Sequence, residues 1–340
     1  MTPPGGPPVA VLGAGSWGTA FAMVLADAGA AVTLWARRRE LVAAIRGRGE
    51  NPDYLPGIQL PAGVGATADA AEALHGAEYV VLAIPSQELR ANLAVWAALL
   101  PPAAILVSLA KGVELHTAKR ISEVVREVAA VEEDRVAVLS GPNLAREVAE
   151  RQPAASVVAC RDAGVAERLQ KVCHSPAFRP YTNTDVIGCE LAGATKNVIA
   201  LAVGMAIGLG FGDNARASVI TRGLAETTRL GVALGADPYT FAGLAGLGDL
   251  VATCSSPLSR NRTFGEKLGQ GLTVAEIAAA SRQVAEGVRS CAPILELARR
   301  HGVDMPIVEH VTHVVRGELT PAEMLTSLVR RSAKPERHGW

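Results

Sequence analysis

The feature that most constrains the fold of this chain is a short apolar run that leads directly into closely spaced glycines. The run from Val9 to Leu12 predicts a buried strand, and Gly13, Gly15 and Gly18 follow it as GxGxxG at the start of a helical stretch. The first glycine permits a tight turn, the second lets a pyrophosphate approach the backbone, and the third lets the helix pack on the strand. The helix adds free N–H groups and a positive dipole. The segment predicts a dinucleotide site; the alternative is an ordinary glycine turn.

The end of the next predicted strand bears on which dinucleotide binds. NAD-binding chains usually carry an acidic residue about 20 positions after the glycines, where it holds the ribose hydroxyls. Here that strand is followed by Arg37, Arg38 and Arg39, and we expect no carboxylate to be available for the ribose. Guanidinium groups can instead hold a 2′-phosphate in bidentate fashion. The pattern favours NADP as the preferred cofactor, with NAD as the other; the alternative is a solvated basic turn.

The first half of the chain alternates β-branched runs with helical patterns, such as residues 17–28 and 119–130. The predicted strands are residues 9–12, 32–35, 79–84, 105–109, 136–139 and 156–159. Strand–helix alternation of this kind predicts an α/β fold, with a Rossmann-type doubly wound parallel sheet.

The pattern changes near residue 188, where long Ala-, Leu- and Gly-rich helical segments replace the strands. These segments are residues 190–209, 218–234, 292–301 and 306–316. A length of 340 residues also suits about two domains. We therefore expect a dinucleotide-binding domain over residues 8–187 and an all-helical substrate domain over residues 188–333.

Composition narrows the partners and the compartment. Lys plus Arg and Asp plus Glu both number 33, so the charge footprint of a nucleic-acid binder is missing. The five cysteines include no CxxC pair, which favours a reducing compartment. The start of the chain has no signal-peptide pattern, and we expect the apolar run Val198–Phe211 to be too short to span a bilayer. These features predict a cytoplasmic protein without membrane insertion.

Several polar clusters follow predicted strands or interrupt apolar helices. Lys111 and the segment 140–143 each follow a strand, at the sheet edge where ligands bind. Lys196 lies in an otherwise apolar helix, and an unpaired buried ammonium is costly, although lysine can also extend to solvent. Segments 246–250 and 259–262 read as Gly- and Ser-rich loops. Each cluster has an ordinary alternative as a surface lysine, a turn or a solvated loop.

The sequence does not match the motifs typical of metal sites or of catalytic nucleophiles. His310 and His313 are three residues apart on a predicted helix, but no third ligand has suitable spacing, so a helix surface is the better interpretation and no metal is expected. A nicotinamide cofactor domain, a helical domain and cationic, Asn-bearing clusters suggest hydride transfer to a small anionic carbonyl compound. Spacing alone does not identify the substrate.

From about Val9 to Arg330 the chain resembles the bacterial NAD(P)-dependent glycerol-3-phosphate dehydrogenases. The resemblance lies in the order of many short motifs. They include GAGSWGT from residue 13, YLP from 54, IPS from 84, KG at 111, SGP from 140, GATKNV from 193, ITRGL from 220, GLAGLGDL from 243, TC at 253, SRN from 259 and VAEG from 284. The resemblance implies reduction of dihydroxyacetone phosphate to sn-glycerol 3-phosphate, the backbone precursor of glycerophospholipids, by a homodimer.

The resemblance also implies roles at matching positions. The cofactor residues would be Gly13, Gly15, Ser16, Trp17, Gly18, Arg37, Arg38, Tyr54, Lys111, Ala145, Arg260, Val284 and Glu286. The substrate residues would be Lys111, Gly141, Asn143, Lys196, Asp249, Ser259, Arg260 and Asn261. Lys196 resembles the acid/base lysine of the family, with Lys111 and Asp249 as further catalytic residues. Asn143 departs from the family, which often carries Ser or Thr there.

Two other interpretations remain open at this point. One is a related NADP-dependent dehydrogenase of a small hydroxyacid or ketopantoate-like compound, which would need a grip on a carboxylate in place of a phosphate. The other is a non-catalytic NADP(H) sensor, against which the presence of Lys111, Lys196 and Asp249 argues.

Overall fold

The computed structural model describes residues 5–280, 285–332 and 335–336. The chain divides into two compact units, one formed by Met1–Ala110 with Ile121–Val186 and the other by Lys111–Arg120 with Ile187–Trp340. The segment Lys111–Arg120 thus belongs to the second unit, although the predicted boundary placed it in the first. Lys111 is therefore in the same unit as Lys196 and Asp249.

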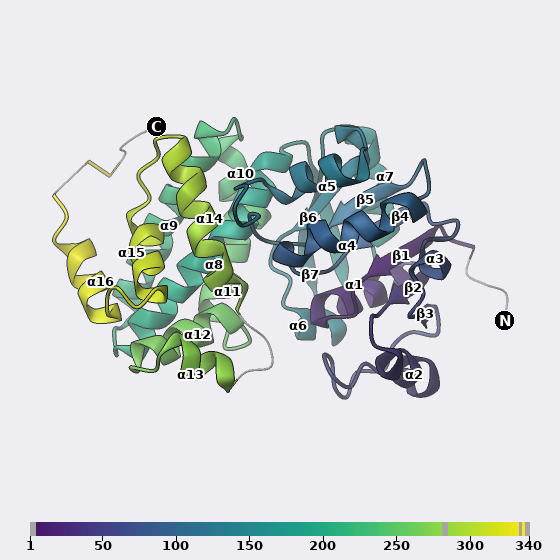
Figure 1. Ribbon diagram of the computed structural model, residues 1–340, viewed down its shortest axis with the longest axis horizontal. Helices are drawn as coiled ribbons and strands as arrows, with labels where there is room; N and C mark the ends of the chain where they lie inside the picture. Colours follow the sequence, from purple (N-terminus) through teal and green to yellow (C-terminus); the bar gives the residue numbers. More distant parts are fainter. Residues whose placement is uncertain (1–4, 281–284, 333–334, 337–340) are drawn as a thin grey trace. The chain divides into compact units, whose positions relative to one another are not determined.

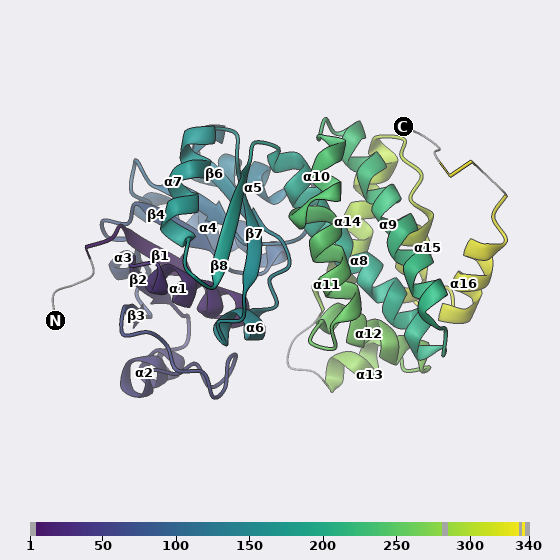
Figure 2. The same cartoon turned by 180° about the vertical axis from the view of Figure 1, so that it is seen from behind.

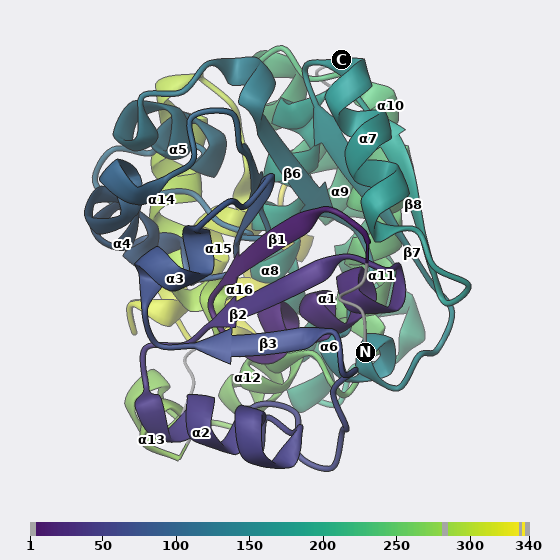
Figure 3. The ribbon, with the colours of Figure 1, turned by 90° about the vertical axis from the view of Figure 1, so that its right-hand side faces the viewer.

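The first unit is built on one eight-stranded sheet with the order β3-β2-β1-β4-β5-β6-β7-β8. The strands are β1 (Pro8–Leu12), β2 (Ala31–Trp35), β3 (Val64–Thr67), β4 (Tyr79–Leu82), β5 (Ile105–Ser108), β6 (Val136–Ser140), β7 (Ala154–Cys160) and β8 (Phe178–Asn183). The first six strands of this order, from β3 to β6, pair in parallel, and Figure 3 shows β1, β2 and β3 side by side. The predicted Rossmann-type fold is confirmed.

Two details of the sheet differ from the prediction. β7 runs antiparallel to β6, because only the five-residue helix α6 (Ala145–Ala149) connects them and the chain turns back without a full crossover. β3 and β8 were not predicted. Both are edge strands, where pairing on one side tolerates residues such as Gly65 and Pro180 that weaken a strand pattern.

Helices cover both faces of this sheet, and the strands alternate between two cores. Val9 and Val11 of β1 face one core, whereas Ala10 and Leu12 face the other. The first core is completed by α1 (Ser16–Asp27), α2 (Arg39–Arg48), α6 and α7 (Ala163–Cys173). The second is completed by α3 (Ala70–Leu74), α4 (Leu89–Trp96) and α5 (Ile121–Ala129) (Figure 1). Burial on both faces explains why the strands read as nearly continuous apolar runs.

From Val186 onward the regular elements of the second unit are all helices within the described residues, as predicted (Figure 2). Its elements are α8 (Val186–Gly208), α9 (Asp213–Ala233), α10 (Pro238–Ala242), the π-helical turn η4 (Leu244–Gly248), α11 (Asp249–Ser255), α12 (Arg260–Gly269), α13 (Val274–Ala279), α14 (Glu286–Arg300), α15 (Pro306–Val315) and α16 (Pro321–Val329). The segment Lys111–Arg120 adds a short excursion closed by a bridge between Val113 and Arg120.

Helix α8 is the core of this unit. It has 23 residues, so the prediction that its apolar run is too short to cross a bilayer was wrong: the helix begins at Val186, well before Val198. By length and composition alone it is the one described helix that could span a membrane, with a mean hydropathy of 1.5. However, 89% of that window is buried inside the protein, as in the core helix of a folded domain.

Glycines let α12 approach α8 very closely. A Cβ at Gly204 of α8 would lie 2.1 Å from the Arg262 carbonyl oxygen, and one at Gly265 of α12 would lie 2.1 Å from the Leu201 carbonyl oxygen. Gly208 and Gly269 repeat this arrangement one turn further along. The crossing has no room for side chains, and it fixes α12 and its first residues against α8.

Candidate functional site

The glycine turn between β1 and α1 has the geometry that a dinucleotide requires. Gly13 has a φ of 125°, and a Cβ there would lie 2.4 Å from the Ala83 carbonyl oxygen. A Cβ at Gly18 would lie 2.0 Å from the Gly13 carbonyl oxygen, whereas one at Gly15 would meet nothing within 4 Å. The first and third glycines are therefore fixed by packing, and the second borders open space at the N-terminus of α1.

Two polar groups near this turn are also suited to a pyrophosphate. Helix α1 begins after Gly15 with no side-chain cap, so its first N–H groups are available to an anion. The indole N–H of Trp17 is buried and has no acceptor among the described residues. An orphaned buried donor beside an uncapped helix start fits a phosphate-bearing ligand.

The segment after α2 is tied to the glycine turn by a buried asparagine. Asn51 is fully buried, and its Nδ2 donates to the carbonyl oxygen of Ala14 at 2.9 Å and to the hydroxyl of Thr19 at 2.7 Å. Its Oδ1 accepts from the backbone N–H of Tyr54 at 3.3 Å, and the hydroxyl of Ser16 donates to the carbonyl oxygen of Tyr54 at 3.1 Å. Tyr54 is thus held against the start of α1.

Contrary to our expectation, a carboxylate lies beside one of the arginines that follow β2. Asp53, 15 residues beyond Arg38, hydrogen-bonds and ion-pairs with the Arg38 guanidinium. This hydrogen bond raises the pKa of Arg38, and the Tyr54 hydroxyl acts in the same direction. Arg37 is exposed and forms no hydrogen bond or ion pair within the described part of the chain. The carboxylate was missed because it follows α2 and reaches Arg38 only through the fold.

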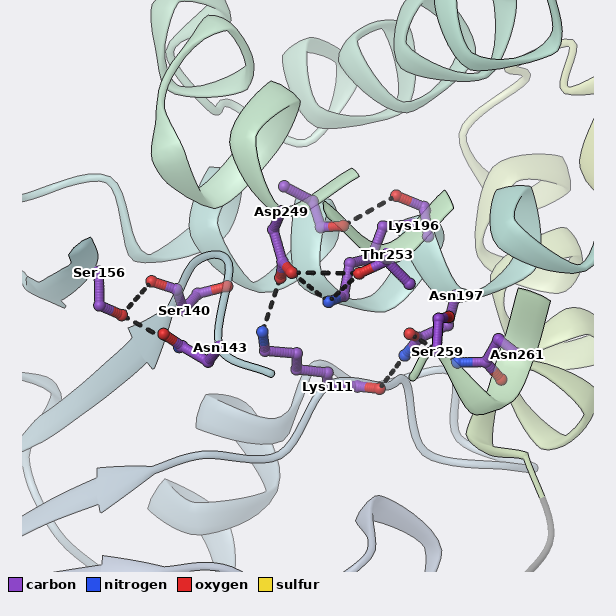
Figure 4. Close-up of polar contacts among 12 residues, drawn as sticks. Lys111, Ser140, Asn143, Ser156, Lys196, Asn197, Asp249, Thr253, Ser259 and Asn261 are labelled. Atoms are coloured by element: carbon purple, nitrogen blue, oxygen red, sulfur yellow. Dashed lines mark hydrogen bonds and ion pairs between the residues drawn. The ribbon is translucent and has the colours of Figure 1, made fainter. Parts of the chain in front are cut away.

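The second unit brings the predicted catalytic residues together (Figure 4). Lys111 Nζ lies 2.6 Å from Asp249 Oδ2, and Lys196 Nζ donates to Asp249 Oδ1 and, at 2.8 Å, to the Thr253 hydroxyl. The side chain of Asp249 is 1% exposed, that of Lys196 9% and that of Lys111 13%. One carboxylate thus stands between two ammonium groups, and the cluster carries a net positive charge.

Burial is the main influence on Lys196. It lowers the pKa of this ammonium to about 8, with the like charge of Lys111 adding to the lowering and the carboxylate of Asp249 opposing it. A group with a pKa near neutrality is suited to proton exchange. Its axial neighbours on α8, Ile199, Ala200 and Val203, are all buried, as the sequence pattern indicated.

Buried amides connect the lysine cluster to the start of α12. Asn197 Nδ2 donates to the backbone carbonyl of Lys111 at 3.3 Å, and Asn261 Nδ2 donates to Asn197 Oδ1 at 2.9 Å. Asn261 Oδ1 in turn accepts from the backbone N–H of Gly287 at 2.9 Å. Ser259 is the N-cap of α12 and Arg260 its first residue, so an arginine and a helix N-terminus adjoin the amides.

The residues after β6 form a separate cluster in the first unit (Figure 4). Asn143 Nδ2 donates to the hydroxyl of Ser156 at 3.1 Å, and that hydroxyl donates to the carbonyl oxygen of Ser140 at 2.8 Å. Gly141 has a φ of 138°, a conformation that favours glycine. The Oδ1 of Asn143 and the hydroxyl of Ser140 are buried and have no partner among the described residues. Asn143 therefore offers an acceptor rather than a hydroxyl group.

The remaining predicted site residues lie at the starts of helices or outside the residues that the structure describes. Ala145 is half-buried at the start of α6. Glu286 is the first residue of α14, and burial raises the pKa of its carboxyl group while Arg260 and both lysines of the cluster oppose the rise. Val284 lies outside the described residues.

Two segments that read as loops are helical. Residues 244–248 form η4, and Asp249 begins α11 directly after it. A Cβ at Gly246 would lie 2.1 Å from the carbonyl oxygen of Phe241, so packing overrides the low helix propensity of glycine. Residues 260–262 form the first turn of α12. Asp249 and Arg260 are consequently held by regular structure.

The described residues include no group of three His, Cys, Asp or Glu side chains arranged to hold a metal ion. On α15, His310 Nδ1 lies 2.7 Å from the carbonyl oxygen of Pro306, and His313 pairs with Glu318.

No site role was predicted for several residues that the structure joins to these clusters: Asn51, Asp53, Ser156, Asn197 and Thr253. Two of them left a signal. Thr253 follows Asp249 by one helical turn on α11, and Asn197 directly follows Lys196. The other three reach their partners through connections that carry no periodic pattern.

Two family models match successive parts of the chain. The model described as NAD-dependent glycerol-3-phosphate dehydrogenase N-terminus matches residues 8–166. The model described as the C-terminus of the same enzyme matches residues 185–326.

Curated relatives match over nearly the whole length. A glycerol-3-phosphate dehydrogenase (NAD(P)+) of Streptomyces griseus is 65% identical over 328 residues, which cover 96% of this chain and 98% of the relative. The enzyme of the same name from Thermobifida fusca is 65% identical over 332 residues, covering 97% and 99%. The crystal structure of a glycerol-3-phosphate dehydrogenase from Coxiella burnetii superposes with a TM-score of 0.91 at 37% identity, covering 96% of this chain and 99% of that one.

Proposed function

Because the chain belongs to the NAD-dependent glycerol-3-phosphate dehydrogenase family, we propose that it transfers hydride between NADPH or NADH and dihydroxyacetone phosphate, giving sn-glycerol 3-phosphate. The observation that carries the proposal is the buried cluster in which Asp249 pairs with both Lys111 and Lys196. A non-catalytic sensor has no need for two desolvated ammonium groups, which are costly to bury.

When bound, the reduced nicotinamide cofactor would supply the hydride for reduction of the ketone. Lys196 donates a proton from Nζ to the ketone oxygen as negative charge develops there, and it accepts the proton in the reverse direction. Lys111 adds positive charge beside the oxygen. Asp249 and Thr253 hold the Lys196 ammonium in place through their hydrogen bonds.

The phosphate of the substrate is assigned to the start of α12. Arg260 supplies a guanidinium group, and the N-terminus of this ten-residue helix adds its dipole. Ser259 and Asn261 line the same turn, next to the amide chain that reaches Lys111. Gly141 and Asn143 are also assigned to the substrate, with Asn143 Oδ1 accepting from a substrate hydroxyl.

The cofactor is assigned to the glycine turn and its surroundings. Gly15, Ser16, Trp17 and Gly18 would hold the pyrophosphate, and Arg37 would hold a 2′-phosphate, which favours NADP over NAD. Arg38, Tyr54, Lys111, Ala145, Arg260, Val284 and Glu286 complete the proposed set.

The wider biological setting follows from this activity. We expect a cytoplasmic homodimer that is not inserted in a membrane, binds no nucleic acid and supplies the backbone precursor of glycerophospholipids. The even balance of 33 basic and 33 acidic residues supports the exclusion of nucleic acid.

The deciding experiment follows NADPH oxidation with dihydroxyacetone phosphate, with phosphate-free dihydroxyacetone and with ketopantoate. We expect turnover with the phosphorylated ketone only, because the site presents a phosphate grip. Turnover of ketopantoate alone would indicate the hydroxyacid dehydrogenase instead. NADPH binding without turnover of any of the three compounds would indicate the sensor.

A further inference from the structure

Asp53 brings a carboxylate to the position where the sequence motif lacks one. It follows α2 by several residues, yet it pairs with Arg38, which directly precedes α2 and follows β2. The carboxyl end of β2 is where Rossmann folds distinguish a ribose 2′-hydroxyl from a 2′-phosphate. A negative and a positive group therefore meet at the point of discrimination.

The position of Asp53 is fixed by its neighbours on both sides. Asn51 is anchored to the glycine turn through Ala14, and Tyr54 is anchored to the start of α1 through Ser16. The backbone N–H of Leu55 donates to the carbonyl oxygen of Asn51 at 2.9 Å and closes the turn. Asp53 lies within this closed turn with its side chain 38% exposed, so its pairing with Arg38 does not depend on a freely moving loop.

The two neighbouring arginines are consequently different. Arg37 has no hydrogen bond or ion pair within the described residues, whereas part of the Arg38 guanidinium is already occupied by Asp53. A phosphate monoester carries a charge of about −1.5 to −2 near neutral pH, so it competes with Asp53 for Arg38 and is repelled by the carboxylate. A ribose hydroxyl is uncharged and meets neither obstacle.

We propose that Asp53 is a specificity-determining residue that moderates the preference for NADPH by occupying Arg38, and so allows the chain to use NADH as well. The inference rests on the proposed function only in taking NADPH and NADH as the cofactors. Arg37 supplies the attraction for the 2′-phosphate, and Asp53 limits how much Arg38 adds to it.

The test is to measure the Kd of NADPH and of NADH for Asp53→Asn by fluorescence titration in the absence of substrate. Asparagine keeps the size of the side chain and removes its charge. We expect NADPH to bind the Asp53→Asn variant about three- to tenfold more tightly than it binds the parent protein, an effect of the size expected for a half-exposed ion pair. The Kd of NADH should change by less than about twofold. An unchanged ratio of the two Kd values would overturn the proposal.

Two controls make the test specific. Glu40→Gln removes a charge of the same sign from the first turn of α2, two residues after Arg38, and should leave the ratio unchanged. In an Arg38→Ala background, Asp53→Asn should alter the ratio much less than in the parent protein, because only the direct repulsion between carboxylate and phosphate remains. If the effect is as large as in the parent protein, Asp53 does not act through Arg38 and the proposal is wrong.

The outcome is separable from that of the proposed function. The titrations need no substrate, so a failure to reduce dihydroxyacetone phosphate would overturn the proposed activity without affecting this measurement. Asp53→Ser serves as a second uncharged variant if Asp53→Asn has an altered thermal melt, and the same tightening of NADPH is expected from it.

Discussion

The dinucleotide-binding turn of the first unit and the lysine cluster of the second are built in opposite ways. The turn is shaped by backbone and by the absence of side chains at Gly13 and Gly18, and its nearby arginines are exposed. The cluster is made of charged side chains, and Asp249 is 1% exposed between its two lysines. Solvent screens exposed charges, whereas removing the partner of a buried charge strongly destabilises the protein. Substitutions should therefore have graded effects at the first site and severe effects at the second.

The cluster is also complete within one unit. The excursion that carries Lys111 is held by a buried ion pair between Arg120 and Glu190 of α8, with 2.7 Å between their charged atoms. Arg300 of α14 donates to the carbonyl oxygen of Thr117 at 2.8 Å and holds the same excursion at its far end. The relation among Lys111, Lys196 and Asp249 thus depends on the packing of the helical unit alone.

The largest effect is expected from Lys196→Met, which probes the buried site directly. Methionine keeps much of the volume and the apolar stem, so α8 should persist, but no proton donor remains. Turnover should fall at least about a hundredfold, because proton transfer by a placed group contributes about 10²–10⁴-fold. NADPH binding should remain nearly normal, since Lys196 is not among the residues assigned to the cofactor.

Turnover and NADPH binding are measured on one sample, which guards against misfolding. Lys171→Met, at an exposed position of α7, is the matched control and should behave like the parent protein. A folded Lys196→Met protein with near-parental turnover would contradict the assignment and make Lys111 the next candidate for the acid.

The same contrast explains what was predictable. The glycine turn is a local pattern, so β1, α1 and the Rossmann-type sheet follow from the sequence. Lys111, Lys196 and Asp249 were identified as a set through the family resemblance, but their pairing and the burial that lowers the pKa of Lys196 arise from residues far apart in the chain. The pairing of Asp53 with Arg38 and the assignment of Lys111–Arg120 to the second unit left no periodic signal in the sequence, because both depend on the path of connecting segments in the folded chain.

The second largest effect is expected from Arg260→Ala, at the edge of the buried site. The loss of a charge-assisted contact costs about 1.5–3 kcal/mol, so the substrate phosphate should bind about ten- to a hundredfold more weakly. The KM for dihydroxyacetone phosphate is the measurement, and NADPH binding is followed in parallel because Arg260 is also assigned to the cofactor. Arg299→Ala, on an exposed turn of α14, serves as the control in the same unit. An unaltered KM for the phosphorylated substrate would move the phosphate grip elsewhere.

The pH dependence provides a third comparison. Reduction needs the protonated form of Lys196 and oxidation needs the neutral form. With its pKa near 8, reduction should slow as the pH rises above this value, by up to about tenfold per unit, whereas oxidation of sn-glycerol 3-phosphate should accelerate as the pH rises towards this value and level off above it. Turnover is measured in both directions over this range. Parallel profiles in the two directions would show that Lys196 is not the titrating acid and base.

The smallest effect is expected from Arg37→Ala at the exposed site. Arg37 is solvated and forms no ion pair within the described residues, so it is free to meet a 2′-phosphate, but solvent weakens the attraction. NADPH should bind about fivefold more weakly, while NADH, which lacks the phosphate, should change by less than about twofold. Arg38→Ala should have a smaller effect than Arg37→Ala, because Asp53 already occupies Arg38. The Kd values of both cofactors are measured for both variants by fluorescence titration. Equal losses for NADPH and NADH would remove the 2′-phosphate assignment, and a larger loss at Arg38 would make Arg38, rather than Arg37, the main phosphate ligand.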